Sequence, residues 1–313
     1  MLNIYNLYIT RSKYELSYLY KLLQFLSYIE LNNTLVTIVH INFKYSDDVP
    51  NIKFNNKRMI ANVYNFGTTF NKTEVVIYNL NDLIKLYNKP KPGKVIFVYT
   101  GHSDGMYLIK KKVRLLRIED FCELVYQVND SQKADLIIFD CCLCGNIGAL
   151  YVCYPFTNYV IASTSYQSYL SMLQTQNLYR SDKDFKDIIK EIGSLEKVDT
   201  EAYDTNYSLY EMNEHFLTFV NLTLNYKCQF NYNKSYVIDS AKYKDIECCF
   251  KELCINVTPL LNKFVLFNRY HKTKCGNRKL NKKKDYSIPS KLMIVMKRPI
   301  KTNLPTKADI FLK

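Results

Sequence analysis

Two short apolar runs in the middle of the chain, each ending abruptly in reactive side chains, constrain its fold more than any other feature. The run at residues 94–100 leads into a glycine and His102, and the run at residues 134–140 ends in an acid that precedes Cys142. Apolar runs of this length between turn-forming residues are typical of strands buried on both faces, as in the centre of a parallel sheet. In such sheets the carboxyl edge carries the chemistry, so neighbouring strands would present this histidine and this cysteine together.

A thiol beside an imidazole is the smallest set of side chains that supports nucleophilic catalysis, because the imidazole favours the thiolate and can protonate a leaving amine. Of the four histidines, only His102 follows a strand that ends in glycine. Two plainer interpretations stay open. Cys142 could be an ordinary buried thiol that only packs, and His102 could be a solvent-exposed histidine in a loop.

Apolar periodicity on either side of these strands predicts alternating strands and helices. Residues 3–10, 14–31 and 34–43 predict a strand, an amphipathic helix and a second strand, which together form a βαβ unit. Further strands are predicted at 59–66, 74–78, 106–109 and 159–164, and helices at 81–87, 118–128, 145–151, 184–192 and 209–226. The sequence therefore predicts an α/β fold.

The order of these features resembles the caspase-like cysteine peptidases, in which a strand ends in Gly-His and a second strand, about 40 to 50 residues later, ends in Asp-x-Cys. Segments 139–143 (FDCCL) and 159–163 (YVIAS) are most similar to the clostripain branch, which typically has Phe-Asp-Ala-Cys-Leu-Met and then Tyr-x-hydrophobic-Ala-Ser. The resemblance covers residues 95–166. It implies a three-layer fold with a mostly parallel central sheet flanked by helices, and cysteine endopeptidase activity on protein or peptide substrates.

The resemblance also implies roles for individual residues. Cys142 would be the nucleophile and His102 the proton donor to the leaving amine. Backbone N–H groups of Ser103 and Cys142 would hold the oxyanion. Asp140 would face the pocket for the side chain before the cut and select Arg or Lys, with Ser163 in the same pocket wall. As plainer interpretations, Asp140 could cap the following helix and Ser163 could be a turn residue.

Two positions depart from the family pattern. Ser103 stands where the family usually has glycine, and it adopts positive φ less easily. Gly148 stands where the clostripain branch often has Glu. Both departures favour a second hypothesis, in which the protein is a catalytically weak or inactive relative that serves as a regulatory or binding module.

A third hypothesis comes from the spacing Cys141-x-x-Cys144, which after a strand and before a helix would suit a thiol oxidoreductase. No cysteine or histidine set has the usual spacing of a zinc site, so no metal ligands are predicted. We expect no cofactor, although the resemblance leaves calcium open because some relatives are activated by it.

Composition restricts the class of protein. The chain has 313 residues, 48% of them hydrophobic, and lacks both a long uncharged apolar stretch and the features of a leader peptide in residues 1–10. The ten cysteines include adjacent pairs that suit disulfides poorly, which indicates reduced thiols. We therefore expect an intracellular protein, cytoplasmic or nuclear, without a membrane span. The abundance of Asn, Lys, Tyr and Ile with no Trp indicates an AT-rich coding genome, such as that of a large DNA virus or a parasite, so the protein could be virus-encoded.

Charge and composition divide the chain into three predicted parts. Residues 1–170 form the catalytic α/β domain, residues 171–262 a helix-rich continuation of it or a subdomain, and residues 263–313 a basic C-terminal arm. The arm holds 15 Lys and Arg against two acids, so it carries +13 of the net charge of +14. It would be either a loosely ordered arm or a basic hairpin, and it would bind an acidic partner or nucleic acid or remain solvated.

Overall fold

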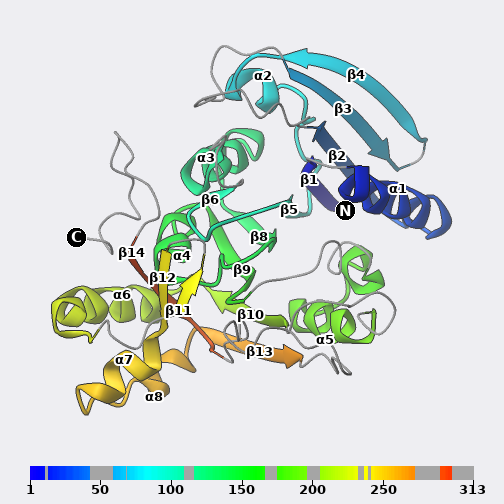
Figure 1. The fold of residues 1–313 in the computed structure, drawn as a ribbon. Helices are drawn as coiled ribbons and strands as arrows, with labels where there is room; N and C mark the ends of the chain where they lie inside the picture. The colour runs from blue at the N-terminus through cyan, green and yellow to red at the C-terminus, as the bar shows by residue number, and fades with distance from the viewer. Residues whose placement is uncertain are drawn as a thin grey trace, which may run out of the picture.

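The computed structural model describes residues 1–10, 13–42, 59–67, 69–108, 116–165, 175–195, 205–231, 236–238, 241–271 and 290–297. Within these residues, nine strands form one central sheet in the order β13-β10-β9-β8-β5-β1-β2-β3-β4. The five strands β9, β8, β5, β1 and β2 pair in parallel, and antiparallel strands extend the sheet at both edges. The predicted α/β fold with a mostly parallel central sheet is confirmed (Figure 1).

The N-terminal third forms one side of this sheet. Its elements are β1 (Leu2–Thr10), α1 (Lys13–Tyr28), β2 (Thr34–Asn42), β3 (Met59–Phe66), β4 (Asn71–Ile77) and α2 (Leu80–Ile84). Strands β1 and β2 pair in parallel around α1, as the βαβ prediction requires. Strands β3 and β4 follow as an antiparallel hairpin at the edge.

The middle of the chain supplies the strands that carry the predicted site. Its elements are β5 (Lys94–Thr100), β6 (Tyr107–Leu108), β7 (Leu116–Arg117), α3 (Ile118–Val128), β8 (Ala134–Asp140), α4 (Ile147–Cys153) and β9 (Thr157–Ser163). Strand β5 lies between β1 and β8, so the site strands are at the centre of the sheet. Both strands are almost completely buried, which explains their unbroken apolar sequences.

The remaining elements include β10 and β13, which form one edge of the sheet, and they occupy the lower half of Figure 1. They are η1 (Gln176–Tyr179), α5 (Phe185–Leu195), β10 (Thr205–Glu211), α6 (Glu214–Tyr226), η2 (Lys227–Gln229), β11 (Tyr236–Ile238), β12 (Ala241–Asp245), α7 (Ile246–Glu252), α8 (Thr258–Leu261), β13 (Val265–His271) and β14 (Met293–Lys297). The predicted helix at 209–226 starts too early, because residues 209–211 extend β10, and the helix begins at Glu214 behind its N-cap Asn213.

Two hydrophobic cores lie on the two faces of the central sheet. On one face, α1, η1 and α5 cover the even-numbered side chains of β5 and β8, such as Val98 and Ile138. On the other face, α2, α3, α4 and α6 cover the odd-numbered side chains, such as Tyr99 and Phe139. Figure 1 shows α1 and α5 on one side of these strands and α3, α4 and α6 on the other. Alternation along a strand therefore decides which core each site residue joins.

The structure corrects part of the predicted C-terminal arm. Strand β13 pairs with β10 in the central sheet, and β14 pairs with β12 in a three-stranded sheet. Leu292, Met293 and Ile294 are each only 1% exposed. Proximity in sequence to many lysines concealed these short apolar runs. The rest of that range, and with it the predicted partner-binding surface, lies outside the described residues, as does the predicted boundary at 170.

Candidate active site

The two strands predicted to carry the site are adjacent and parallel. Thr100 at the end of β5 is in register with Asp140 at the end of β8, and the N–H of Gly101 donates to the Asp140 carbonyl at 3.3 Å. The chain therefore leaves both strands at the same point of the sheet's carboxyl edge. His102 and Cys142 each follow this register pair by two residues, in the histidine loop (101–105) and the cysteine loop (141–146).

Side chains tie the two loops to each other. The Ser103 hydroxyl lies 3.2 Å from the Cys144 sulfur. The Asn146 side-chain amide donates to the carbonyl of Gly105 at 2.7 Å and to that of Leu143 at 2.9 Å. Gly105 has φ +86, and an added Cβ would lie 2.9 Å from the Leu143 carbonyl oxygen, so this crossing requires glycine. The contacts make the loops one packed unit.

A strained turn follows Cys142. Leu143 has φ 65, a left-handed conformation that costs a bulky residue on the order of 1–3 kcal/mol. The neighbouring segment after β9 holds this turn, because Leu143 N–H donates to the Ser165 carbonyl at 3.1 Å and Gly145 N–H to the Ser163 carbonyl at 2.7 Å. The helix predicted from residue 145 starts later, at Ile147, with Asn146 as N-cap. Cys142 therefore lies on a fixed turn that precedes the helix and is 9% exposed.

Glu15 and His102 form a partly buried contact that the sequence did not predict. Glu15 Oε1 lies 3.0 Å from His102 Nε2, with the two side chains 9% and 28% exposed. The Tyr99 hydroxyl donates to the His102 carbonyl at 3.0 Å, which anchors the backbone of the same residue. The imidazole is thus fixed both through its ring and through its main chain.

The position of Glu15 on α1 offered a signal for this contact. Leu19, Leu22 and Leu26 are the buried stripe of the helix, each at most 2% exposed, and Glu15 precedes them at the same helical spacing. A carboxylate on a core stripe costs free energy unless it has a partner. The acid at a core position could therefore have pointed to a buried partner.

Asp140 lies on the face covered by α1, in a polar row across the sheet. His40, Tyr8, Thr100 and Asp140 are successive register partners on β2, β1, β5 and β8. Asp140 is only 1% exposed. Burial, with a smaller contribution from the charge of Asp140, raises the pKa of Tyr8 well above its usual range. The carboxylate is therefore enclosed, close to at least one phenol.

Ser163 ends β9 on the same face and is completely buried. Its hydroxyl donates to the Ser165 carbonyl at 3.1 Å and accepts from the Ser165 N–H at 3.1 Å, so the side chain closes a local turn. The Ser163 carbonyl in turn holds Gly145. Ser163 therefore contacts the cysteine loop through its backbone carbonyl, while its hydroxyl stays within the local turn.

Cys142 shares the core covered by α3 and α4 with several other thiols. Cys141 and Cys144 sulfurs are 3.4 Å apart, and Cys122 and Cys153 sulfurs are 3.7 Å apart, all four buried and unbridged. Burial, followed by the hydrogen bond with Cys144, raises the pKa of Cys141 well above its usual range. Reactive redox cysteines are accessible and have low pKa values. This environment disfavours the oxidoreductase hypothesis for Cys141-x-x-Cys144.

The predicted strain at Ser103 does not occur. Among the described residues, positive φ at non-glycine positions is confined to Asn33, Asp130, Ser131, Leu143 and Cys254. Serine therefore fits the conformation that the histidine loop adopts, and its hydroxyl also accepts from the Gly105 N–H at 2.8 Å. The replacement of glycine at this position carries no backbone penalty here.

The described part of the chain contains no group of three or more His, Cys, Asp or Glu side chains that could hold a metal ion. Within the same ranges, no helix is long and apolar enough to cross a membrane.

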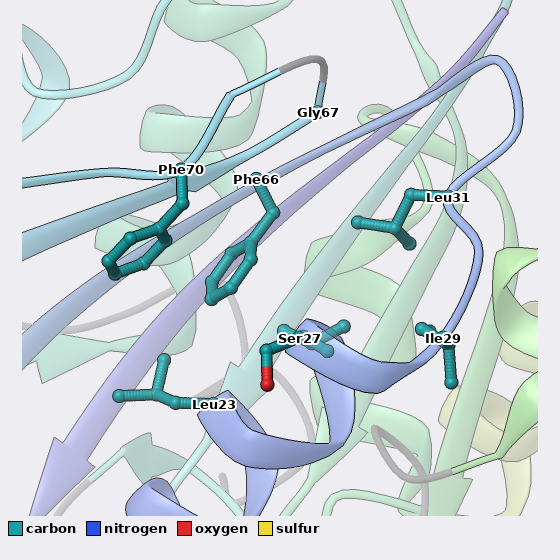
Figure 2. A pocket seen from close by; sticks show the side chains of 8 residues that line it. Leu23, Ser27, Ile29, Leu31, Phe66, Gly67 and Phe70 are labelled. Atoms are coloured by element: carbon teal, nitrogen blue, oxygen red, sulfur yellow. The ribbon is translucent and has the colours of Figure 1, made fainter.

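A separate cavity of about 380 Å³ opens between the end of α1 and the β3–β4 turn. Figure 2 shows its aromatic and aliphatic walls, to which Phe66, Phe70 and Leu23 contribute. None of the predicted site residues lines it. The cavity is therefore distinct from the candidate active site.

Comparison with solved structures finds chains of the same architecture. A secreted C11 cysteine protease from Bacteroides thetaiotaomicron, "iotapain", aligns with TM-score 0.64 and 11% identity over 86% of each chain. An inactive zymogen C11 protease from Parabacteroides distasonis aligns with TM-score 0.61 and 11% identity, over 86% of this chain and 84% of that one. The Bacteroides protease with an irreversible peptide inhibitor aligns with TM-score 0.56.

No protein-family model and no curated protein sequence matches this chain. At 11% identity the structural similarity establishes the architecture and not the chemistry. The caspase-like expectation for the fold is confirmed, and this chain has the fold of the clostripain-like C11 cysteine proteases.

Proposed function

We propose that this protein is a cysteine endopeptidase that uses Cys142 and His102. The observation that carries the proposal is the register of β5 and β8, which delivers the histidine and cysteine loops to one point of the sheet edge. The Ser103–Cys144 contact joins these loops. The fold shared with C11 cysteine proteases adds independent support.

In the proposed reaction, His102 takes the proton of the Cys142 thiol, and the thiolate attacks the carbonyl carbon of the scissile peptide bond. The tetrahedral oxyanion collapses as His102 returns the proton to the leaving amine, which leaves a thioester on Cys142. Water, deprotonated by His102, then hydrolyses the thioester to release the acid and restore the thiol. Neither a metal nor a redox step enters this sequence.

Backbone N–H groups of Cys142 and Ser103 would stabilise the oxyanion. Strained turns such as that at Leu143 persist where the surroundings fix them, and they often occur at functional sites. The hydrogen bonds from Leu143 and Gly145 to the segment after β9 supply that support. A fixed turn favours catalysis because its donors need not reorganise during the reaction.

Asp140 would select substrates with Arg or Lys before the cut. A carboxylate beside the nucleophile pairs with a basic side chain through charge-assisted hydrogen bonds and repels an acidic one. Among the described residues, the buried hydroxyls of Tyr8 and Thr100 in the same polar row lack hydrogen-bond partners and could accept from the substrate. Ser163 lies next to this row on β9 and would support the pocket wall. Because Asp140 is 1% exposed, substrate binding would require the side chains that cover it to move.

The test is steady-state hydrolysis of fluorogenic peptides that differ only in the residue before the cut. The proposal predicts cleavage after Arg and Lys and none after Asp, with activity abolished in Cys142→Ala and His102→Ala. Cleavage after Asp, Asn or apolar residues would reject the role of Asp140 and leave the Cys142–His102 pair standing. Full activity in Cys142→Ala would reject the proposed function.

A second candidate, a peptide-binding module without turnover, is favoured by the low exposure of Cys142 and Asp140. The same peptides separate the two. A binding module retains affinity for an uncleaved Arg peptide, measured by calorimetry, and shows no release of the fluorophore in the intact chain.

A further inference from the structure

Glu15 meets the histidine loop because of where α1 begins. Strand β1 pairs with β5 in parallel, with Tyr8 opposite Thr100, and α1 starts at Lys13 shortly beyond that pair. The first turn of α1 therefore reaches the same sheet edge as the loop after β5. Glu15 is the acidic residue of that first turn, and its carboxylate meets the imidazole of His102 at 3.0 Å.

Burial makes this contact informative. The Glu15 side chain is 9% exposed, and a carboxylate so enclosed needs a strong partner, whereas exposed ion pairs contribute little. Among the other charged pairs of the described chain, Arg180–Asp182 and Lys89–Asp130 are largely exposed, whereas Lys244–Glu252 also has a buried member. Glu15 and His102 are instead 87 residues apart and joined at the predicted centre of chemistry.

We propose that Glu15 is the positioning residue of the active site, a role that rests on the proposed function. Its carboxylate accepts from the Nε2–H of His102, which fixes the ring orientation and the Nε2–H tautomer. The proton exchanged with Cys142 and with the leaving amine then passes through Nδ1. When His102 takes the thiol proton, the resulting imidazolium is stabilised by the Glu15 charge, and no proton passes to Glu15.

The same contact supports the thiolate. Thiolate and imidazolium form together, so a carboxylate behind the ring offsets the cost of creating the cation in a partly buried site. The Tyr99 hydroxyl holds the His102 carbonyl and fixes the backbone, while Glu15 fixes the ring. The arrangement is therefore a series of contacts in which Glu15 orients His102 and His102 activates Cys142.

The kinetic test compares Glu15→Gln and Glu15→Ala with wild type on a peptide with Arg before the cut. The Gln side chain keeps the shape and one hydrogen bond of Glu15 but not its charge. The Ala side chain lacks the shape, the hydrogen bond and the charge. We expect kcat to fall about 10-fold in Glu15→Gln and about 100-fold in Glu15→Ala, with KM within about twofold of wild type. Losses of this size are typical when a residue that hydrogen-bonds a functional side chain is removed. Glu30→Gln, an exposed acid just after α1, is the matched control and should leave kcat unchanged.

A purely structural role would give a different pattern. It would lower the melting temperature and the fraction of titratable sites, with normal kcat per active site. Unchanged kcat per titrated site in both Glu15 variants would overturn the positioning role. If the Cys142→Ala variant is inactive, such a result rejects only the role of Glu15. If the Cys142→Ala variant is active, the proposed function itself is rejected.

A second readout does not depend on activity. Nitrogen NMR of ¹⁵N-histidine protein reports the tautomer of each ring, and His102→Gln assigns the His102 signals. We expect the Nε2–H tautomer in wild type and a mixture of tautomers in Glu15→Ala. An Nδ1–H tautomer in wild type, or the same spectrum in both proteins, would contradict the proposed hydrogen bond.

Discussion

The two faces of the sheet at the end of β8 differ sharply in chemistry, although they are separated by single residues. Asp140 points to the face covered by α1, where Glu15, His102 and Tyr8 also lie. Cys141, the next residue, joins the core covered by α3 and α4, and that core also holds Cys142, Cys144, Cys122 and Cys153. One face gathers groups that carry or exchange charge, and the other gathers thiols held in an apolar core.

The difference shows how one thiol among several can be selected. Burial raises the pKa of Cys141 and of Cys153 well above the usual range, so both stay protonated. Cys142 belongs to the same core but is 9% exposed, against at most 1% for the other thiols of that core, and the turn at Leu143 redirects the chain directly after it. A thiol becomes reactive where it meets an imidazole, whereas complete burial in an apolar core disfavours the thiolate.

Cys142→Ala gives the largest effect that the comparison predicts. Loss of the nucleophile should lower kcat/KM on an Arg peptide by at least about 10³-fold, because the neighbouring thiols are almost completely buried. Peptide hydrolysis by purified protein measures it, with unchanged melting temperature as the control for folding. Retained hydrolysis would mean that the apolar face supplies the nucleophile.

Removal of β14 should give the largest loss of stability. A chain that ends at His271 lacks Leu292, Met293 and Ile294, whose burial contributes roughly 1.5–3 kcal/mol each as an upper estimate. Met293 N–H also donates to the Gly145 carbonyl at 3.0 Å in the cysteine loop. Urea unfolding measures the loss against a chain that ends at Lys297. Equal stability of the two chains would show that the C-terminal segment is a dispensable arm.

Asp140→Asn tests the charged face directly. Loss of the carboxylate leaves a basic substrate side chain unpaired, which should cost about 3 kcal/mol of transition-state stabilisation. For Arg and Lys peptides kcat/KM should therefore fall about a hundred-fold. Alkylation of Cys142 by iodoacetamide, which is small and uncharged, should keep its rate. Equal loss in both assays would mean that Asp140 supports the fold of the site and does not select substrates.

Much of this arrangement could be predicted from the sequence. Buried parallel strands have unbroken apolar sequences, so β5 and β8 and the residues that follow them were identifiable, and the β1–α1–β2 unit followed from periodicity. Glu15 was missed because only the fold brings residue 15 to residue 102. The hairpin alternative allowed strands in the last fifty residues, but their pairing with β10 and β12 could not be predicted, because pairing across long sequence separations leaves no local pattern.

The polar row on the charged face predicts sensitivity to acid. Burial, followed by the charge of Lys72, lowers the pKa of His40 from 6.5 to about 4, so His40 stays neutral in the folded chain. Its stabilising contribution is complete above pH 6.5 and falls as the pH drops toward 4, by about 3 kcal/mol, because the unfolded chain binds the proton first. Urea unfolding at pH 7 and pH 4.5 should show a smaller acid loss in His40→Gln, and an identical loss would exclude His40 as the source.

Cys141→Ala and Cys144→Ala should have the smallest effects. Each thiol lies in the apolar core, so each variant should lose less than about 1 kcal/mol of transition-state stabilisation in the hydrolysis of an Arg peptide. Cys144→Ala also removes the contact with the Ser103 hydroxyl, so it should lose more than Cys141→Ala. A loss in either variant that equals the loss in Cys142→Ala would show that the paired thiols carry the chemistry.

The central claim is that one thiol of the cluster is activated by His102 and the others are inert. Its most direct test is labelling of the full chain with an acyloxymethyl ketone carrying Arg, followed by peptide mapping by mass spectrometry. A reactive thiolate displaces the carboxylate leaving group and forms a stable thioether. We expect the label on Cys142 alone, and a much slower reaction in His102→Ala. Label on Cys141 or Cys144, or an unchanged rate in His102→Ala, would contradict the claim.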